Sequence, residues 1–543
     1  MTDLEIPLGK RTKFYRFFEM LPGILSYLMI LLPILLSFIS PLYGAVFIIV
    51  FIIIWFVKTL GMTYRTIQGY DTLQRAQKID WKGRLADLEG PAAALHSRHY
   101  STSWRSEVHQ HNLEQLDATI HARKPSDIYN AVIIATYNEA REVLEPTIRA
   151  VLEGNYDPKR IIMTIAYEAR GPESTEQAVK ALQKKYEDDF HKFYIVKHPA
   201  NMPDEVVGKG GNITYAGKFL AGEIEKLGID PENVLITTLD SDNRPHPSYF
   251  SYVTYEFIVH PEPRHVAFQP LALFQNNIWD VPAPMRVIAT GNSFWNILNS
   301  LRPHMLRNFA AHSQSMAALI DMDFWSTRTI VEDGHQFWRS YFRYDGHYTV
   351  VPIYIPIYQD AVLADGYRKT LAAQFIQLRR WAYGASDVPY VASKVFTRER
   401  TVPFWDGFTK FLRLLEGHVS WASASVILLV GAWGPLFINP ESNRSLVAHE
   451  LPTVASGLQQ FAMVGLFVTI FLAFRMLPPR PERYKRHRNF GMLIQWVLMP
   501  ITSVVYGSAA AIYAQTRLLI GKYLDRFDVT EKAVVKDDGE TIS

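Results

Sequence analysis

The chain has 543 residues, of which 48% are hydrophobic and 20% are charged, so it is long enough for several domains. A net charge of only +3 excludes the strong positive field that nucleic-acid binding requires. The sequence has no cysteine, which excludes disulfides and Cys-ligated metal centres.

Two apolar runs near the N-terminus, Leu21–Ile39 and Tyr43–Val57, contain no charged residue. Each is close to the roughly 20 residues that cross a bilayer as a helix. The break at Ser40-Pro41-Leu42 predicts a helical hairpin rather than a cleaved signal peptide, because the runs occur in tandem without a small-residue cleavage site. The alternative is a buried hairpin in a soluble core. The basic flanking residues predict that both ends are cytoplasmic: Lys10, Arg11, Lys13, Arg16, Lys58 and Arg65.

From Met62 to Pro403 no stretch is long and apolar enough to cross a membrane. The sequence alternates between short β-rich runs and amphipathic helical stretches, which predicts a mostly parallel sheet covered on both faces. The predicted strands are Tyr129–Thr136, Arg160–Tyr167, Phe193–Lys197 and Val234–Leu239, and the predicted helices are Glu142–Glu153, Glu173–Tyr186 and Asn212–Leu227. Ligands of such sheets bind at the carboxyl ends of the strands.

One of those strand ends carries Asp240-Ser-Asp242. Mg²⁺ and Mn²⁺ prefer oxygen ligands, and Mg²⁺ is usually held by one or two carboxylates plus substrate phosphates. The position at a strand end favours a metal site. A turn in which the aspartates cap backbone N–H groups is the alternative.

A second acidic pair, Glu332 and Asp333, precedes a predicted short helix. One of these carboxylates is suited to accept a proton from an acceptor hydroxyl. The alternative is that the two acids only stabilise the helix N-terminus through its dipole.

A third polar feature is the stretch Gln374–Gly384. Arg380 offers a planar donor group suited to phosphate, and Trp381 offers a flat surface for a sugar or a base. An ordinary amphipathic helix with a solvated arginine is the alternative.

Three further apolar runs lie near the C-terminus, at Val419–Ile438, Leu458–Phe474 and Met492–Ala514. The basic loop Pro478–Arg488 between the last two is predicted to be cytoplasmic. Five crossings would leave the C-terminus outside, so we favour a last run that Pro500 splits into a re-entrant or interfacial pair. The polar residues after it are expected to be loose.

Several short motifs occur in a characteristic order: ATYNEA at 135–140, GKGGN at 208–212, DSD at 240–242, VED at 331–333, QLRRW at 377–381 and FDVTEK at 527–532. Together they resemble the processive, membrane-embedded branch of glycosyltransferase family 2. This group has the GT-A fold and includes cellulose, chitin and hyaluronan synthases. The resemblance covers about residues 128–390 well and the membrane segments in outline.

The resemblance implies roles for individual residues. Asp333, with Glu332 beside it, would be the general base, and Asp242 would coordinate Mg²⁺ or Mn²⁺ on the diphosphate, with Asp240 near nucleotide and metal. The remaining residues would surround the donor and the acceptor sugar: Thr136, Tyr137 and Glu139 in the nucleotide pocket, Lys209 on the donor side, and Gln377, Arg380 and Trp381 over the pyrophosphate and acceptor.

The chain departs from the family pattern at two turns. Glu168 stands where the family has one or two aspartates that hold the nucleotide base, which leaves the choice between UDP and GDP open. The acceptor-side turn reads Phe309–Met316, with His312 and Ser313 where a small glycine–serine turn is expected. The acid motif reads VED instead of TED, and keeps both carboxylates.

The predicted organisation is an α/β GT-A domain inserted between terminal transmembrane helices. Its parts are residues 1–61 (tail and hairpin), 62–127 (connecting segment), 128–402 (GT-A domain), 403–520 (interfacial and transmembrane helices) and 521–543 (polar tail). The predicted protein is a multi-pass protein of the cell membrane with a cytoplasmic catalytic domain, in contact with membrane lipids. An accessory subunit is compatible with this organisation.

The predicted function is inverting transfer of a sugar from a UDP- or GDP-sugar to a growing polysaccharide. Transfer of a single sugar to a lipid carrier is a second hypothesis. A catalytically silent membrane scaffold or nucleotide sensor is a third. A transporter is disfavoured because no charged residue lies in the middle of the clear apolar runs.

Overall fold

The computed structural model describes residues 4–97, 104–119, 122–431, 433–434, 439, 446–524, 526–528, 532–535 and 541–542. Its strands are β1 (Tyr129–Thr136), β2 (Ile161–Glu168), β3 (Lys192–His198), β4 (Val234–Asp240), β5 (Arg244–Pro245), β6 (Val266–Phe274), β7 (Ser313–Ser315), β8 (Thr349–Gln359), β9 (Val534–Val535) and β10 (Thr541–Ile542). The first eight form one sheet, and β9 pairs with β10 near the C-terminus.

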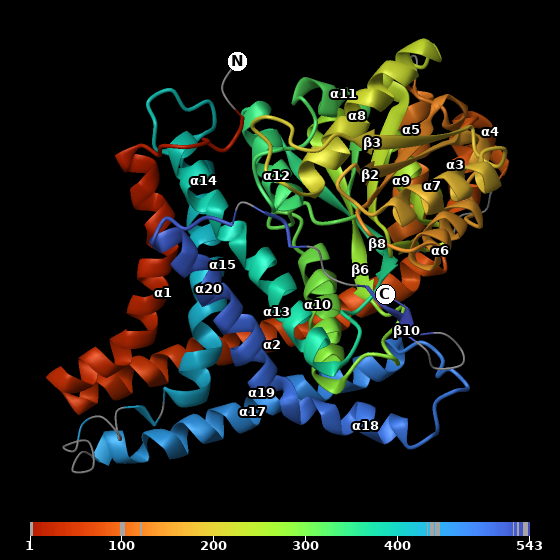
Figure 1. Ribbon diagram of the computed structural model, residues 1–543. Helices are drawn as coiled ribbons and strands as arrows, with labels where there is room; N and C mark the ends of the chain where they lie inside the picture. Colours follow the sequence, from red (N-terminus) through yellow and green to blue (C-terminus); the bar gives the residue numbers. More distant parts are fainter. Residues whose placement is uncertain are drawn as a thin grey trace.

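The large sheet has the strand order β3-β2-β1-β4-β7-β6-β8-β5 (Figure 1). β1 pairs in parallel with β2 and β4, β2 pairs in parallel with β3, and β6 pairs in parallel with β8. β7 runs antiparallel between β4 and β6, and β5 runs antiparallel to β8. The mostly parallel, Rossmann-like α/β sheet predicted for a GT-A domain between terminal apolar helices is therefore confirmed.

Helices cover both faces of the sheet (Figure 1). Those of the sheet domain are α6 (Arg141–Leu152), α7 (Glu173–Tyr186), α8 (Lys209–Lys226), α9 (Tyr249–Val259), α10 (Ala283–Ser300), α11 (Met316–Asp321), α12 (Glu332–Arg343), α13 (Tyr367–Ala382) and α14 (Asp387–Val395). Along β1, Val132 and Ile134 pack on the side of α6, α7 and α9, whereas Ala131 and Ile133 pack on the side of α8 and α11. This alternation is what a strand buried on both faces requires.

Short 3₁₀ turns that begin with proline lead into four of the strands. They are Pro125–Asp127 before β1, Pro158–Arg160 before β2, Pro231–Asn233 before β4 and Pro263–His265 before β6, and a further 3₁₀ turn, Tyr383–Ser386, links α13 to α14. Proline fixes the backbone angle φ and needs no N–H partner at the first position of a helical turn, so it suits the entry to a buried strand.

The described residues contain four helical segments that are long and apolar enough to cross a membrane: Lys13–Ile39, Pro41–Gln77, His449–Met476 and Arg488–Leu519. They include four of the five predicted runs. The fifth, Val419–Ile438, overlaps the end of α15 (Phe404–Val430) and continues into residues that lie partly outside the described ones. These helices associate the chain with a membrane.

The segment Arg488–Leu519 is helical throughout and contains Pro500. It consists of α18 (Arg488–Ile494), a 3₁₀ turn (Gln495–Leu498), α19 (Met499–Thr502), a π-helical turn (Ser503–Ser508) and α20 (Ala509–Leu519). The segment changes direction near α19 (Figure 1). The irregular turns on either side of α19 account for this bend, because they break the regular α-helical ladder.

The first two apolar helices, α1 (Lys13–Ile39) and α2 (Pro41–Gln77), meet at Ser40 with no intervening loop. α2 does not end with the apolar run at Val57 but continues for another five turns or so. Its last turns bury Leu73 against Ile297 of α10 and Leu271 of β6. The predicted connecting segment 62–127 thus begins as the same helix and goes on through α3 (Trp81–Asp87), α4 (Pro91–Ser97) and α5 (Trp104–Asp117).

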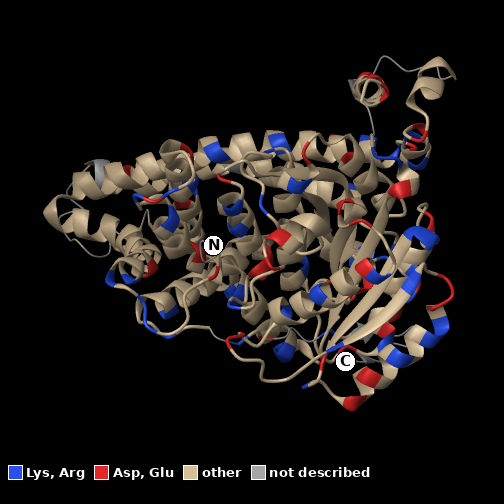
Figure 2. Ribbon diagram, turned by 90° about the horizontal axis from the view of Figure 1, so that it is seen from above, with Lys and Arg blue, Asp and Glu red and all other residues tan. Residues whose placement is uncertain are grey.

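Acidic and basic residues are interspersed along the ribbon (Figure 2), as the small net charge of +3 leads one to expect.

α1 packs beside α15 and α20, and α2 packs beside α17 (Leu446–Met476) (Figure 1). The sheet domain therefore sits directly on the apolar helices rather than on a flexible linker.

Two glycines of α8 give a test of how tightly this helix is seated. A Cβ atom at Gly210 would lie 2.4 Å from the carbonyl oxygen of Ser326, whereas a Cβ atom at Gly222 would meet nothing within 4 Å. We expect Gly210→Ala to destabilise the protein by about 1–3 kcal/mol through overpacking. Gly222→Ala should instead stabilise it by about 0.5–1 kcal/mol, because alanine lowers the backbone entropy lost on folding. Thermal unfolding of the detergent-solubilised variants measures both, and equal shifts would contradict a tight seat at Gly210.

Candidate active site

The candidate site lies where β1, β2 and β4 end, at the carboxyl edge of the sheet. Thr136 is the last residue of β1, Glu168 is the last residue of β2, and Asp240 is the last residue of β4. β1 is hydrogen-bonded to both of the other strands. The topology therefore places three of the predicted residues along one edge, as expected for an open α/β sheet.

Lys209, the first residue of α8, lies at the centre of this edge. Its Nζ is 3.0 Å from Asp240 Oδ1, 3.2 Å from Asp333 Oδ2 and 3.9 Å from Glu332 Oε1, and its side chain is only 9% exposed. A single ammonium group thus joins the end of β4 to the first turn of α12. The structure brings together the predicted donor-side lysine, the first aspartate of the DSD motif and the predicted base.

The electrostatics of this cluster distinguish its acids. Burial opposes ionisation of Asp240, but the charges of Lys209 and Lys532 lower its pKa to about 2. Burial also disfavours the charge on Lys209, yet Asp240, Asp333 and Glu332 outweigh it and raise the lysine pKa. Burial and the charge of Asp333 raise the pKa of Glu332. Because a protonated carboxyl group cannot accept a proton, this environment favours Asp333 over Glu332 as a base.

Asp242 belongs to a second, adjacent cluster. Its Oδ1 accepts a hydrogen bond from Lys532 Nζ at 2.8 Å, and its Oδ2 accepts one from the backbone N–H of Asp360 at 3.1 Å. The two aspartates of the DSD motif therefore have different cationic partners, Lys209 for Asp240 and Lys532 for Asp242. This arrangement relieves the repulsion between the two carboxylates.

Asp360 is a site residue that the sequence reasoning missed. It follows β8 directly, burial and the charge of Asp242 raise its pKa, and its buried Oδ1 accepts no hydrogen bond from the described residues. The signal that could have found it is the same as for Asp240, an acid at the end of an apolar β-rich run. The run Thr349–Gln359 was not among the predicted strands.

Parts of the C-terminal tail cover the site, contrary to the expectation of a loose segment. The N–H of Phe527 donates to the carbonyl oxygen of Val207 at 2.8 Å, and the guanidinium of Arg380 lies 3.8 Å from the centre of the Phe527 ring. Asp528 forms an ion pair with Arg379. Residues 529–531 of the FDVTEK motif lie outside the described residues. The described parts nevertheless place Lys532 at Asp242.

Arg380 is partly buried near the first cluster, where it interacts electrostatically with Glu332, Asp240 and Asp333. Gln377 and Trp381, on the same helix, have other contacts. Gln377 accepts a hydrogen bond from Gln374 at 3.0 Å, and the Trp381 ring lies 6.1 Å from that of Phe274. Among the three predicted residues of the QLRRW motif, Arg380 interacts with the acids, whereas the described contacts of Gln377 and Trp381 are with other residues.

The ATYNEA turn after β1 is held by Glu139. Its Oε2 accepts hydrogen bonds from Thr136 Oγ1 at 2.7 Å and from the Tyr137 N–H at 2.8 Å, and its Oε1 accepts one from Ser241 Oγ at 3.1 Å. Glu139 therefore ties the end of β1 to the DSD turn. These contacts give it a role in shaping the turn, whatever it contributes to a nucleotide pocket.

Glu168 is buried and forms an ion pair with Arg170. The guanidinium of Arg170 in turn lies 4.6 Å from the centre of the Tyr137 ring. The turn that replaces the usual aspartates is thus connected, through Arg170, to the predicted nucleotide pocket.

The acceptor-side turn places His312 beside the predicted base. His312 Nδ1 lies 3.7 Å from Asp333 Oδ1, and the His312 side chain is fully buried. Ser313 begins β7, where its Oγ is 2.6 Å from Thr237 Oγ1 and 2.7 Å from the Tyr249 hydroxyl. Of the two residues, His312 faces the site, whereas Ser313 belongs to the sheet.

The residues around Asp242 fit a divalent cation that arrives with a diphosphate. The described residues contain no group of three or more His, Asp or Glu side chains arranged to hold a metal ion. Mg²⁺, however, usually takes one or two carboxylates and fills its other positions with phosphate oxygens and water. Asp242 supplies such oxygens, and so does Asp360, whose Oδ1 accepts no hydrogen bond within the described residues; the Lys532 ammonium beside Asp242 shows that the site takes a positive charge.

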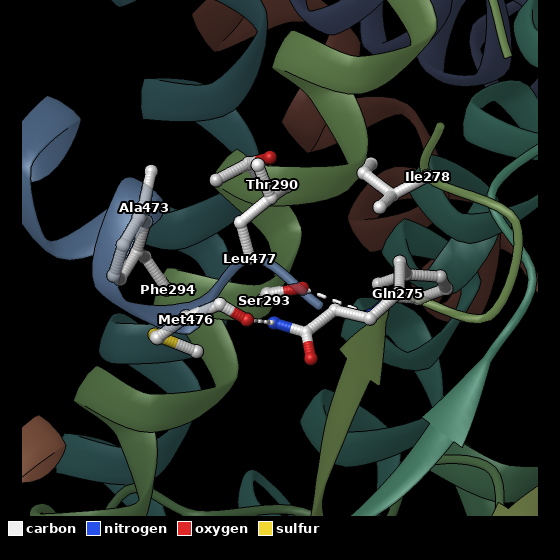
Figure 3. A pocket seen from close by; sticks show the side chains of 9 residues that line it. Gln275, Ile278, Thr290, Ser293, Phe294, Ala473, Met476 and Leu477 are labelled. Atoms are coloured by element: carbon white, nitrogen blue, oxygen red, sulfur yellow. Dashed lines mark hydrogen bonds between the residues drawn. The ribbon is translucent and has the colours of Figure 1, made fainter. Parts of the chain in front are cut away.

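A small apolar cavity lies away from these acids, where the sheet meets α10 and α17 (Figure 3). Gln275 Nε2 donates to the carbonyl oxygen of Met476 at 3.0 Å across it, and Ser293 Oγ accepts from the N–H of Phe274 at 3.0 Å. These contacts attach the sheet to a membrane-type helix. The cavity has no titratable lining residue and is a structural junction.

No family model matches the chain, and no curated protein matches it. Among solved structures, the mannosyltransferase PcManGT from Pyrobaculum calidifontis, in complex with GDP-Man and Mn²⁺, is similar at 14% identity and a TM-score of 0.42, covering 85% of this chain and 99% of that one. TarS residues 1–349 from S. aureus, in complex with UDP-GlcNAc, is similar at 12% identity and a TM-score of 0.36, covering 76% of this chain and 96% of that one.

Glucosyl-3-phosphoglycerate synthase from Mycobacterium tuberculosis, in complex with Mn²⁺, UDP and phosphoglyceric acid, is also similar. It gives 12% identity and a TM-score of 0.28, covering 49% of this chain and 78% of that one. Identities and TM-scores this low assign neither a family nor a reaction to the chain.

The Lys209 cluster makes a stability prediction. Lys209→Met leaves the buried Glu332 and the partly exposed Asp240 and Asp333 without their cation, so we expect a loss of about 1–3 kcal/mol at pH 7, less than for a fully buried pair. The control is Lys218→Met on the same helix, whose pair with Asp323 is 49% and 78% exposed. That exposed pair should contribute at most about 1 kcal/mol. Unfolding in detergent measures both variants, and equal losses would contradict a buried, cation-dependent cluster.

The pH dependence of this loss has a definite sign. The pKa of Asp240 is about 2 in the folded chain, below its ordinary value of 3.8. The stability that the pair contributes is therefore fully present above pH 3.8 and is lost as the pH falls towards 2. The difference between wild type and Lys209→Met should accordingly shrink on acidification.

Proposed function

We propose that this chain is a membrane-bound, metal-dependent glycosyltransferase that moves a sugar from a nucleotide-sugar to a growing polysaccharide with inversion at the anomeric carbon. The observation that carries the proposal is the convergence of Lys209, Asp240 and Asp333 at the carboxyl edge of the sheet. Sugar transfer from a nucleotide requires a base for the acceptor hydroxyl and positive charge for the departing diphosphate. This edge offers both within hydrogen-bonding distance.

The proposed reaction is a single displacement. Asp333 accepts the proton of the acceptor hydroxyl while the oxygen of that hydroxyl bonds to the anomeric carbon. The bond from that carbon to the diphosphate oxygen breaks, and the electron pair leaves with the diphosphate. Attack and departure on opposite faces of the carbon invert its configuration.

Positive groups of the chain stand ready for the leaving diphosphate. Lys209, whose side chain is 9% exposed, and the partly buried Arg380 lie close to Asp240, where solvent screens a charge less than at an open surface. A divalent cation, Mg²⁺ or Mn²⁺, held by Asp242 and Asp360 would offset further charge on the diphosphate. Lys532, now bonded to Asp242, would exchange its partner for the diphosphate when the donor binds.

Packing between the site and the membrane helices supports a polymer product. α13, which carries Arg380, packs on α20 through Phe375 and Tyr513, whose ring centres are 6.2 Å apart. Arg379 lies over the Tyr513 ring at 5.2 Å. The helix that carries Arg380 is therefore attached directly to a membrane-type helix, which supports an acceptor that is held at the membrane. We place the chain in the cell membrane with the sheet domain in the cytoplasm, as the basic flanks of the apolar helices favour.

A donor screen tests the proposal. Purified protein in nanodiscs is incubated with UDP-glucose, UDP-GlcNAc or GDP-mannose, each with Mg²⁺, with Mn²⁺ or with EDTA, and the products are sized. We expect one donor to give a metal-dependent polymer that does not enter the organic phase. A discrete organic-soluble glycolipid would overturn the polymer claim in favour of a lipid carrier. Nucleotide binding without transfer from any donor would overturn the enzyme claim in favour of a silent scaffold or sensor.

A matched pair of substitutions separates the two acidic clusters. Asp333→Asn removes the base, so we expect transfer to fall by about 10²–10⁴-fold while binding of UDP or GDP with Mn²⁺ is retained. Asp242→Asn should instead weaken the dependence of nucleotide binding on Mn²⁺ and reduce transfer with it. Calorimetric titration with UDP or GDP, with and without Mn²⁺, distinguishes the variants. Unchanged transfer by Asp333→Asn would show that Asp333 is not the base.

A further inference from the structure

His312 is a buried polar residue beside the proposed base that has no role in the reaction described above. Its side chain is completely inaccessible to solvent. The carbonyl oxygen of His312 accepts a hydrogen bond from the N–H of Thr238 at 3.3 Å, so its backbone is attached to β4, the strand that ends in Asp240. The imidazole is thus held at a fixed place relative to both acidic clusters.

The hydrogen bonds of His312 identify its tautomer. The indole N–H of Trp325 lies 3.2 Å from His312 Nε2. An indole nitrogen only donates, so Nε2 must be the acceptor and the ring hydrogen must be on Nδ1. Nδ1 lies 2.8 Å from the carbonyl oxygen of Phe309, to which it donates. His312 therefore presents an N–H on the side of Nδ1.

That side of the ring also faces Asp333. Nδ1 lies 3.7 Å from Asp333 Oδ1, and Oδ1 is buried without a hydrogen bond from any of the described residues. The other carboxylate oxygen, Oδ2, lies 3.2 Å from Lys209 Nζ. The base thus has one oxygen towards the site and one towards His312. Contacts of this kind are often long before substrate binds and shorten in the substrate complex.

The backbone before His312 is in an uncommon conformation. Ala311 has φ = 68°, in the left-handed region that non-glycine residues rarely adopt, and it is fully buried. Such a conformation persists only where the surrounding structure holds it, and functional sites are where it is most often found. The turn therefore directs the imidazole at Asp333 at a cost in backbone strain.

We propose that His312 is a positioning residue for Asp333. In the substrate complex its Nδ1–H is shared between the Phe309 carbonyl oxygen and Asp333 Oδ1, which fixes the carboxylate so that Oδ2 faces the acceptor hydroxyl and favours the ionised form of the base. The inference rests on the proposed function, because it assigns a role within that reaction. His312 stands where the family resemblance leads one to expect a small residue of a glycine–serine turn.

The role is carried by a neutral ring, not by a charge. Burial lowers the pKa of His312, although the charge of Asp333 partly opposes this, and both ring nitrogens are already engaged. The charged or titratable groups that face Asp333 come from its own helix and from two others: Glu332 of α12, Lys209 of α8 and Arg380 of α13. His312 adds an N–H donor to the environment of Asp333 without adding a charge.

Two amide substitutions at this position test the proposal. In His312→Asn the side-chain amide lies about where Nδ1 does, so it keeps an N–H donor towards Asp333. In His312→Gln the amide lies about where Nε2 does, so it keeps only an acceptor for the indole N–H of Trp325. We expect His312→Gln to lower kcat about tenfold, the size usual for a residue that orients a reacting group, with the donor KM unchanged. The acidic limb of its kcat–pH profile should move to higher pH, because loss of a donor disfavours the ionised base. His312→Asn should retain most of the wild-type kcat and profile.

Further variants keep the test decisive. Trp325→Phe removes the group that fixes the tautomer and leaves His312 in place, so it should move the acidic limb in the same direction by a smaller amount. The control is His109→Gln, a buried histidine bonded to Tyr255 and Asp87 away from the site, which should lower the unfolding temperature without moving the limb.

The outcomes separate the two proposals. An active wild type whose His312→Asn and His312→Gln variants have the same kcat and the same pH profile would overturn the role of His312 alone. A movement of the acidic limb in His109→Gln would also overturn it, because the limb would then report general destabilisation. A wild type that transfers no sugar from any donor would overturn the proposed function and the role of His312 with it.

Discussion

The candidate site depends on one buried ammonium group, that of Lys209. It lies within 4 Å of Asp240, Asp333 and Glu332, which come from the end of β4 and the start of α12. Removing a carboxylate from water without a partner costs several kcal/mol, so these acids can be buried together only because a cation lies among them. The charge of Lys209 lowers the pKa of Asp240, whereas burial and the charge of Asp333 raise the pKa of Glu332 in spite of the lysine.

The second cluster shows how the C-terminal tail takes part in the site. Lys532 bonds to Asp242, and Phe527 lies against Arg380. The tail follows α20 directly, and α20 packs on the helix that carries Arg380. The described parts of the tail thus contact both Asp242 and the helix that packs on α20. Chemistry at the sheet edge and contacts in the membrane region are connected through a few residues of chain.

The N-terminal side is joined to the sheet just as closely. α2 runs from its apolar portion into the sheet domain, where a Cβ atom at Gly69 would come within 2.5 Å of Ile297. Gln275 reaches the end of α17 across the small cavity at the junction (Figure 3). Such direct packing holds the sheet domain in a fixed position relative to the apolar helices, which a flexible linker would not do.

Four of the eight strands in the large sheet, β1 to β4, could be predicted from the sequence alone, together with the helices that follow the first three and the polar residues at the ends of β1, β2 and β4. Burial periodicity and backbone hydrogen bonding are local properties, so Tyr129–Thr136 and Val234–Asp240 could be predicted within a residue, and Thr136 and Asp240 with them. The order of the short motifs added Lys209, Asp333 and Arg380. It did not show which of these residues touch.

Which residues become partners depends on long-range packing. Asp360 lies 118 residues from Asp242, and Lys532 lies 290 residues from it. No local pattern pairs groups so far apart, because which side chains meet depends on how whole elements pack. The same holds for His312, whose neighbour Asp333 is on another element, and for α2, whose length beyond Val57 is stabilised by packing on α10 and β6 rather than by its own hydrophobicity. The local sequence pattern shows which polar residues lie at the strand ends, because strand formation and burial are local properties. Which group each carboxylate faces depends on how distant elements pack.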